Sequence, residues 1–330
     1  MAGPRARAFG AGRRLLGGRD LSASLLERDL VVVTGKGGVG KSTVAAALGL
    51  VAAGRGLRTI VAEVARRDDV SRGLRRGGGP ASGTLAGGEG MHEEELAPGL
   101  HHLSIDPEQA MELYLADQLP SALADLLASN RTFSYLAAAT PGMRELLTVG
   151  KVWELAQDDR RTPGADPYDL VILDAPATGH GVAVLSAPRT FAQTARVGRI
   201  ARQGRTIDAM ICDPKRTGVI AVARPEEMPV NETLDLQDAL RDDVGLEVEL
   251  VICNGMLPQR FSAANVRALE AAPDGPEVRA ARHAHARAGA QRAQLRRLRR
   301  RARAAVTTLP HVFDEDGRLS ALARELEGVL

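Results

Sequence analysis

The feature that most constrains the fold is a glycine-rich loop between a predicted strand and a predicted helix. Residues 35–43 read G-K-G-G-V-G-K-S-T, after the β-branched run Leu30–Thr34 and before the alanine- and leucine-rich stretch Ser42–Ala53. Successive backbone N–H groups of such a loop can face one concavity and bind phosphate oxygens, and its glycines allow a close approach. The spacing fits G-x-x-x-x-G-K-[ST] in the strand–loop–helix context that this motif needs. The sequence therefore predicts a P-loop.

The residues of this loop have distinct expected roles. Lys41 is expected to reach the β- and γ-phosphates, and the Ser42 hydroxyl is placed to ligate Mg²⁺. The following helix presents its positive end to the same charge. The predicted ATP-binding residues of the loop are Gly35, Lys36, Gly37, Gly38, Val39, Gly40, Lys41, Ser42 and Thr43.

Lysine is scarce in this chain, and that makes the loop's two lysines informative. Of the 43 basic residues only four are lysine, namely Lys36, Lys41, Lys151 and Lys215. Arginine serves wherever a generic positive charge is enough, so a compact ammonium group is expected to be required at both positions in the loop.

Strand-like and helix-like segments alternate along the rest of the chain. Predicted strands occupy Leu30–Thr34, Thr59–Val64, Leu100–Ile105, Tyr168–Asp174, Thr217–Ala223, Glu247–Asn254 and Ala305–Leu309. Such alternation predicts an α/β fold with a doubly wound, mostly parallel sheet. We expect residues 1–28 to form a basic, disordered arm and residues 29–330 one P-loop ATPase domain. Helix-like sequence at about 107–156 and 186–210 predicts an α-helical insert subdomain.

Composition excludes several classes of protein. The 330 residues are 44% hydrophobic with a net charge of +2, which gives no global bias towards nucleic acid or membrane. No apolar run approaches the roughly 20 residues of a membrane helix. Two cysteines, Cys212 and Cys253, support neither a disulfide scaffold nor a zinc site, so both are expected to be buried structural residues and no zinc is expected. We expect a cytoplasmic protein; the arginine-rich N-terminus leaves an organellar transit peptide as an alternative to a disordered arm.

A second functional segment follows the buried strand that ends at Asp174. A carboxylate at the carboxyl end of a parallel strand faces the crevice where such sheets bind ligands. Asp174 is therefore the expected Walker-B residue, holding Mg²⁺ through water.

The segment Asp174-Ala175-Pro176-Ala177-Thr178-Gly179-His180 resembles the D-T-A-P-T-G-H signature of the arsenical-pump (ArsA) and tail-anchored-protein-targeting ATPase family. Arg224–Thr233 resembles the family's P-E…E-T segment, and G-K-G-G-V-G-K-S resembles its deviant, two-lysine Walker A loop. The similarity covers roughly Leu30 to the C-terminus and is nearest to the bacterial ArsA-like subgroup. Asp174, Thr178, Gly179 and His180 would form switch II.

The resemblance implies further roles. Lys36 would act across a dimer interface on the partner's nucleotide, so that Lys36, Lys41 and Asp174 are the expected catalytic residues. Asn254 would contact adenine, and Pro310 would lie in the loop that closes over the base. The resemblance also implies Mg²⁺, ATP as the substrate and a homodimer or a heterodimer with a paralogue.

The chain departs from the family at the first switch, which reads like S-T-D-P-A-H-x-L-S-D. Alignment on Asp69-Val70-Ser71 places Ala65 where the family has the Asp that orients the attacking water. Alanine cannot orient water, which predicts slow hydrolysis by this chain alone. Glu63 and Asp68 are nearby carboxylates but do not occupy the matching position.

Two functions follow from these residues. The first is an ATPase that works as a dimeric nucleotide switch and moves a client or a membrane partner. The second is a weakened regulatory subunit that pairs with a catalytic paralogue. We do not expect a nucleic-acid partner, because ten arginines between Arg279 and Arg303 are the only sign of one and read best as a solvated helix face. His101, His102, His283 and His285 are expected at the surface, and Trp153 in core or interface packing. For Lys151 a position facing the nucleotide or a partner is left open as an alternative to a residue without a special role.

Overall fold

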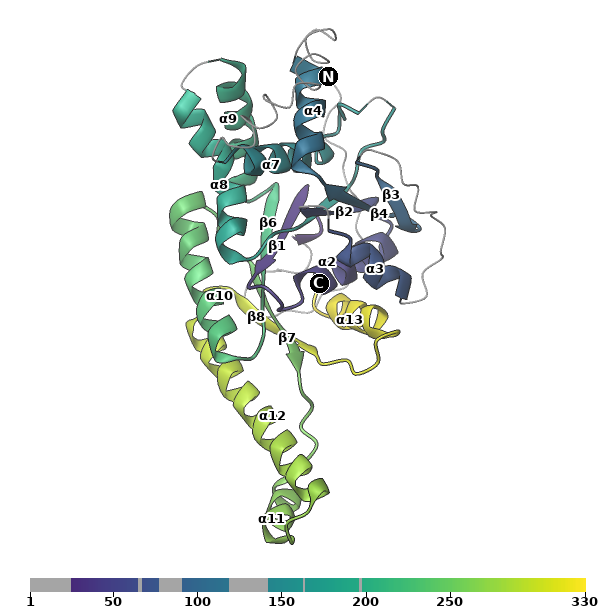
Figure 1. Ribbon diagram of the computed structural model, residues 1–330, viewed down its shortest axis with the longest axis vertical. Coiled ribbons are helices and arrows are strands. Elements are labelled where there is room, and N and C mark those ends of the chain that lie inside the picture. Colours follow the sequence, from purple (N-terminus) through teal and green to yellow (C-terminus); the bar gives the residue numbers. More distant parts are fainter. Residues whose placement is uncertain (1–24, 65–66, 77–90, 119–141, 163, 196–197) are drawn as a thin grey trace.

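The computed structural model describes residues 25–64, 67–76, 91–118, 142–162, 164–195 and 198–330 (Figure 1). The strands are β1 (Leu30–Gly35), β2 (Thr59–Val64), β3 (Glu94–Ala97), β4 (Leu100–Ile105), β5 (Leu170–Asp174), β6 (Thr217–Ala223), β7 (Leu250–Met256) and β8 (Ala305–Pro310). The helices are α2 (Lys41–Gly54), α3 (Asp69–Arg76), α4 (Pro107–Gln118), α7 (Met143–Leu155), α8 (Thr178–Ala195), α9 (Arg199–Ile211), α10 (Glu227–Ala239), η1 (Leu240–Val244), α11 (Ala263–Ala271), α12 (Pro276–Arg301) and α13 (Arg318–Glu327).

The strands form one sheet in the order β3-β4-β2-β5-β1-β6-β7-β8. Every neighbouring pair is parallel except β3–β4, which is antiparallel. β1 lies between β5 and β6, so the loop that follows it opens at the centre of the sheet's carboxyl edge. This confirms the predicted doubly wound, mostly parallel α/β fold.

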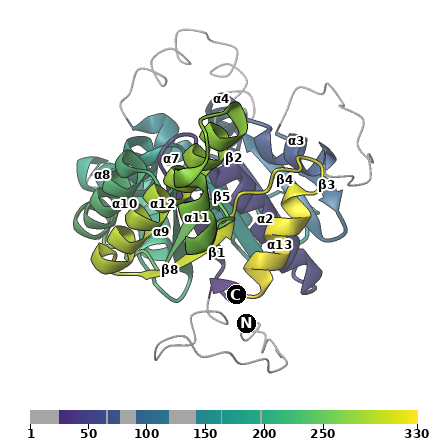
Figure 2. The same ribbon diagram turned by 90° about the horizontal axis from the view of Figure 1, so that it is seen from below.

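Helices cover both faces of the sheet (Figure 2). One core joins the sheet to apolar side chains of α7, α8, α9, α10 and α12. The other joins it to α2, α3 and α13. A parallel sheet buried on both faces needs strands without an alternating polar side, and all five residues of β5 are accordingly buried.

The predicted strands all form, with ends shifted by up to three residues. The helical text at 107–156 contains α4 and α7, and residues 119–141 lie outside the described part of the chain. The predicted helical segment at 186–210 falls on two helices, α8 and α9, and α8 begins at Thr178, only four residues after the end of β5. Helix α8 is therefore coupled directly to Asp174. No helix within the described ranges is long and apolar enough to cross a membrane.

The arginine-rich segment forms a long helix that only partly covers the sheet. The buried residues of α12 are Ala288, Gln291, Leu295 and Leu298, so none lies in its first twelve residues, and α11 buries none of its residues. Helix α11 and the N-terminal part of α12 extend away from the sheet as an arm (Figure 1). The predicted solvated face is thus present, but on a helix that runs beyond the sheet it covers.

Candidate nucleotide-binding site

The loop between β1 and α2 is shaped by two glycines. Gly35 has φ +144°, and a Cβ atom there would overlap the carbonyl oxygen of Val222. Gly40 has φ +96°, and a Cβ atom there would collide with the side-chain amide of Asn254. Because L-residues rarely adopt these angles and no side chain fits, only glycine suits both positions. The loop is thereby held against the ends of β6 and β7, as a phosphate-binding loop requires.

The structure brings together the three residues expected to hold phosphate and metal. Lys41 is 6% exposed, and its Nζ donates to the carbonyl oxygen of Lys36 at 3.1 Å. The Ser42 hydroxyl donates to Asp174 Oδ2 at 2.5 Å, which joins the start of α2 to the end of β5. Asp174 is 3% exposed. A buried ammonium, a hydroxyl and a carboxylate therefore line one end of the loop.

Burial sets the electrostatics of this group. Burial lowers the pKa of Lys41, assisted by the positive charge of Arg67 and opposed by Asp174. Burial raises the pKa of Asp174 to about 6, with a smaller rise from Glu63, although the Ser42 hydroxyl opposes it. Both groups are thus poorly solvated in the free protein. A negative phosphate beside Lys41 and a cation beside Asp174 would relieve both costs.

The residues present fit a magnesium ion. Asp174 Oδ1 is buried and has no hydrogen-bond partner among the described residues, and the same holds for the hydroxyl of Thr34 on β1. Buried acceptors without partners are costly, so they mark a place for a ligand. Mg²⁺ prefers oxygen ligands and keeps several waters, which suits a hydroxyl and one or two nearby carboxylates.

Lys36, the first lysine of the loop, points elsewhere. Its Nζ forms a short ion pair with Glu232 on α10, and the two side chains are 29% and 32% exposed. Gly37 and Gly38, which follow it, are exposed. The ammonium groups of the two lysines therefore lie in different places, that of Lys36 at the rim of the loop and that of Lys41 inside it.

Asn254 lies on β7, and Pro310 ends the neighbouring strand β8. Asn254 Nδ2 donates to the carbonyl oxygen of Val39 at 2.9 Å. Pro310 pairs with Met256 at the ends of β8 and β7, and it is exposed. The structure thus places Asn254 against the P-loop, while contact of Asn254 and Pro310 with adenine stays a prediction.

The predicted switch II residues continue directly into a helix. Thr178, Gly179 and His180 form the first turn of α8, and Gly179 and His180 are exposed. A movement of Asp174 would therefore be passed to α8 through the three residues between them.

The first-switch region is described only in part. Ala65 lies outside the described residues. Glu63 is fully buried, with Oε2 accepting from His102 Nε2 at 2.8 Å and from the Val70 amide at 3.0 Å. Asp68 is exposed and forms an ion pair with Arg72 at 2.7 Å. Glu63 is thus anchored through one carboxylate oxygen, whereas Asp68 lies in an exposed ion pair.

The expectation that His101 and His102 lie at the surface is wrong. Both are buried in β4, 8% and 5% exposed. His102 binds Glu63 of the neighbouring strand, and the ring of His101 meets the edge of the Tyr168 ring at 5.3 Å between centroids. These partners come from distant parts of the sequence, so local spacing gave no sign of them.

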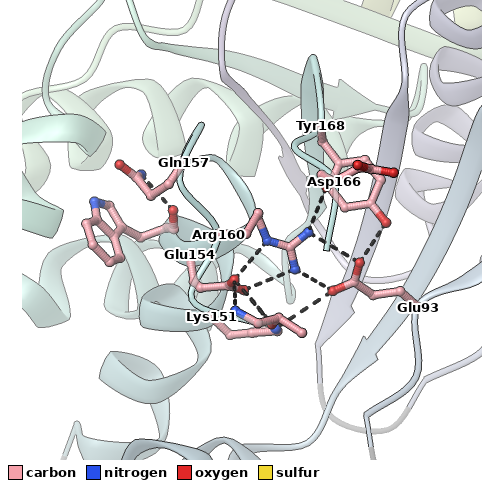
Figure 3. A network of polar contacts seen from close by, with 9 residues as sticks. Glu93, Lys151, Glu154, Gln157, Arg160, Asp166 and Tyr168 are labelled. Atoms are coloured by element: carbon pink, nitrogen blue, oxygen red, sulfur yellow. Dashed lines mark hydrogen bonds and ion pairs between the residues drawn. The ribbon is translucent and has the colours of Figure 1, made fainter. Parts of the chain in front are cut away.

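Lys151 belongs to a buried ion network that the sequence did not reveal (Figure 3). Lys151 Nζ is 2.8 Å from Glu154 Oε2, and Arg160 bonds both Glu154 and Glu93. The Tyr168 hydroxyl donates to Glu93 at 2.7 Å. Although burial acts the other way, hydrogen bonds from Arg160 and Lys151 lower the pKa of Glu154 to about 2. Lys151 thus joins α7 to Glu93, in the segment before β3.

Two smaller expectations have mixed outcomes. Trp153 is half-buried against the core, as predicted, with Arg161 over its ring at 5.0 Å. Cys253 is buried in β7, whereas Cys212 is only half-buried, with its thiol near Arg189 and Asp208.

Comparison with known proteins agrees with this geometry. The family model for anion-transporting ATPases (ArsA) matches residues 28–203 and 194–274. The chain belongs to this family. It is similar to ATPase BagA of Mycobacterium tuberculosis (strain H37Rv), with 28% identity over 255 residues, 76% of this chain and 72% of the relative.

Two further relatives are named as arsenical pumps. A putative arsenical pump-driving ATPase of Halobacterium salinarum is 27% identical over 244 residues, 69% of this chain and 35% of the relative. An arsenical pump-driving ATPase of Escherichia coli is 25% identical over 248 residues, 70% of this chain and 40% of the relative. The chain spans well under half of these two proteins. Family membership makes it a P-loop ATPase, and its partners are a separate question.

Proposed function

We propose that this ArsA-family chain binds ATP with Mg²⁺ at residues 35–43 and hydrolyses it as a dimeric nucleotide switch. The observation that carries the proposal is the group of buried Lys41, half-buried Ser42 and buried Asp174, whose charges and whose unpartnered Asp174 Oδ1 are costly without a ligand.

Each residue of the group has a role that follows from its position. Backbone amides of the loop and Nζ of Lys41 would bind the β- and γ-phosphates. To reach a phosphate, Nζ exchanges the single carbonyl of Lys36 for a charged acceptor. Ser42 and Asp174 would hold Mg²⁺, which when bound neutralises charge on the phosphates. The Ser42–Asp174 bond keeps these two groups in place before the ligand arrives.

Lys36 is proposed to act on the nucleotide of a partner subunit. Its position at the rim of the loop supports this role, since a group inside the loop could not reach across an interface. In the single chain it pairs with Glu232, and a half-exposed ion pair contributes only about 1 kcal/mol or less. Dimer closure could therefore release Lys36 at small cost, after which its ammonium would stabilise developing charge.

Helices of the proposed insert would carry the output of the switch. α8 starts four residues after Asp174 and packs on α7 and α9. A change at the phosphates would thus shift these helices. The recipient is proposed to be a client or membrane partner of a cytoplasmic protein.

A second candidate function is a regulatory subunit with little turnover, paired with a catalytic paralogue. The observation that favours it is Ala65, which removes the expected water-orienting carboxylate. The anchoring of Glu63 by His102 adds to this, because it limits the movement of that carboxylate.

Steady-state ATP turnover tests both candidates. The purified chain is compared with K36A and K41A, alone and mixed with an ArsA-like paralogue encoded nearby. A homodimeric ATPase predicts turnover by the chain alone that both substitutions abolish, with ATP binding retained in K36A. A regulatory subunit predicts turnover only in the mixture. ATP hydrolysis that survives K41A would contradict both.

A further inference from the structure

A row of polar residues crosses three adjacent strands on the face that α2 covers. Asp174 ends β5, and Glu63 occupies the matching register position on β2. His102 lies on β4, beyond Glu63. Ser42 of α2 bonds Asp174 at the near end of the row, and His102 bonds Glu63 at the far end. The two carboxylates are thus neighbours on the sheet.

Glu63 is held firmly by one of its two oxygens. Its side chain is 0% exposed, and Oε2 accepts from His102 Nε2 at 2.8 Å and from the Val70 amide at 3.0 Å. Oε1 is buried and has no hydrogen-bond partner among the residues that the structure describes. The half of the carboxylate that points away from its anchors is therefore available to a ligand.

Asp174 repeats this arrangement on the next strand. Oδ2 accepts from Ser42, while Oδ1 is buried and unpartnered within the described part of the chain. Each unpartnered buried oxygen costs on the order of 1–3 kcal/mol, and two neighbouring carboxylates repel one another when both are ionised. Lys41 is committed to the phosphates in the proposed function. A cation between the two carboxylates would relieve this repulsion.

We propose that Glu63 is a second acidic residue of the magnesium site, with Oε1 accepting hydrogen bonds from the ion's water shell beside Asp174. His102 and the Val70 amide are the positioning groups that fix Glu63 in this orientation. Mg²⁺ typically binds proteins through one or two carboxylates and retains its waters, so an indirect contact of this kind suits it. The inference rests on the proposed function.

The anchored position of Glu63 also bears on the first switch, where Ala65 takes the place of the expected carboxylate. The Glu63 carboxylate cannot move to the position of Ala65, because it is anchored to His102 and Val70. It can instead add to the binding of the ion from β2. This gives β2 and the following α3 a direct link to the bound nucleotide through the Val70 amide.

The test is the Mg²⁺ dependence of nucleotide binding, which does not require turnover. A fluorescent, non-hydrolysable ATP analogue is titrated at increasing Mg²⁺ into the full-length wild type, Glu63→Gln and the control Glu249→Gln. Glu249 is also a carboxylate with an arginine partner, Arg28 at 3.3 Å, and it is half-buried. It directly precedes β7, two strands beyond β1 on the side away from β5, and therefore lies far from the proposed ion. Substitution of residues around a metal site typically weakens metal affinity 10–100-fold.

The expected result is a rise of at least about tenfold in the half-saturating Mg²⁺ concentration for E63Q, with analogue affinity in EDTA unchanged. E249Q should match the wild type. His102→Leu, which removes one anchor of Glu63, should give a smaller rise and carries the test if E63Q does not fold. If folded E63Q keeps the wild-type Mg²⁺ dependence, the proposed role of Glu63 is overturned and the proposed function still stands. The same conclusion follows from a wild-type dependence in H102L when only that variant folds. A wild type that binds no analogue overturns the proposed function, and this inference with it.

Discussion

Two groups of buried charges lie at different ends of β5, and they are built in opposite ways. The group around Glu93, Glu154 and Arg160 meets Tyr168, just before the strand begins (Figure 3). None of its side-chain nitrogen and oxygen atoms is among the buried, unpartnered atoms of the described residues. The group around Asp174, where the strand ends, leaves Asp174 Oδ1, Glu63 Oε1 and the Thr34 hydroxyl without partners.

The difference separates a structural network from a ligand site. Paired charges whose hydrogen bonds are complete hold elements together, and removal of one partner leaves an uncompensated charge. Buried charged groups with oxygen atoms that lack hydrogen-bond partners destabilise the free protein, and they stabilise the complex when a ligand supplies those partners. The same substitution should therefore have opposite effects on stability at the two ends of β5.

The largest expected effect is at Arg160, whose side chain is 1% exposed. Arg160→Ala would leave Glu93 and Glu154 without their main cation, which should lower the free energy of unfolding by about 3–5 kcal/mol. Urea denaturation measures this loss. Arg205→Ala, at an exposed position of α9, is the control and should change stability by less than about 0.5 kcal/mol. A loss at Arg160 no larger than that would mean the network does not hold α7 to β5.

Glu154→Gln should lower the free energy of unfolding by about 3 kcal/mol at pH 7, since the hydrogen bonds of Arg160 and Lys151 hold the pKa of Glu154 near 2 in the folded protein. A depressed folded-state pKa stabilises the protein above the ordinary pKa of the carboxyl group, about 4.5. The difference between wild type and variant should then shrink as the pH falls from about 4.5 towards 2. Urea denaturation at pH 7 and pH 3.5 measures it, and a difference independent of pH would contradict the assignment.

Asp174→Asn should have the opposite sign. In EDTA at pH 8, removal of this poorly solvated charge should raise the free energy of unfolding by about 2 kcal/mol, because burial disfavours the ionised carboxylate. The variant should lose Mg²⁺-dependent stabilisation by ATP at the same time. Thermal unfolding with and without Mg²⁺-ATP tests both effects. A less stable variant in EDTA would place Asp174 with the structural network.

The smallest contrast uses two buried threonines. The Thr34 hydroxyl has no partner among the described residues, whereas the Thr148 hydroxyl donates to the Arg144 carbonyl at 2.8 Å. Thr148→Val should lower the free energy of unfolding by about 1 kcal/mol. Thr34→Val should change it by less, or stabilise slightly, because valine has the same shape and no unmet polar group. Urea denaturation measures both changes. Equal losses in the free energy of unfolding for the two variants would contradict the distinction between a ligand site and a structural network.

The sequence predicted the P-loop and the strands around it because their signals are local. Glycines at 35–40 must adopt special backbone angles, and β5 reads as an unbroken apolar run. The β3 strand was missed because E-E-L-A is short and lacks the β-branched residues typical of strands. The roles of Glu63, His102 and Lys151 could not be read from their neighbours, since each depends on partners that the sheet topology brings from elsewhere.

The central claim is that the unsatisfied group at the carboxyl end of β5 is the site of Mg²⁺-ATP. Its most direct test is the dissociation constant of ATP for the wild type and Lys41→Ala, measured by calorimetry with Mg²⁺ and with EDTA. The account predicts saturable binding to the wild type that is tighter with Mg²⁺, and a loss of at least about 100-fold in K41A, since the loss of a buried ion-pair partner costs about 3–5 kcal/mol. Equal affinity of the two proteins, or binding unaffected by Mg²⁺, would contradict it.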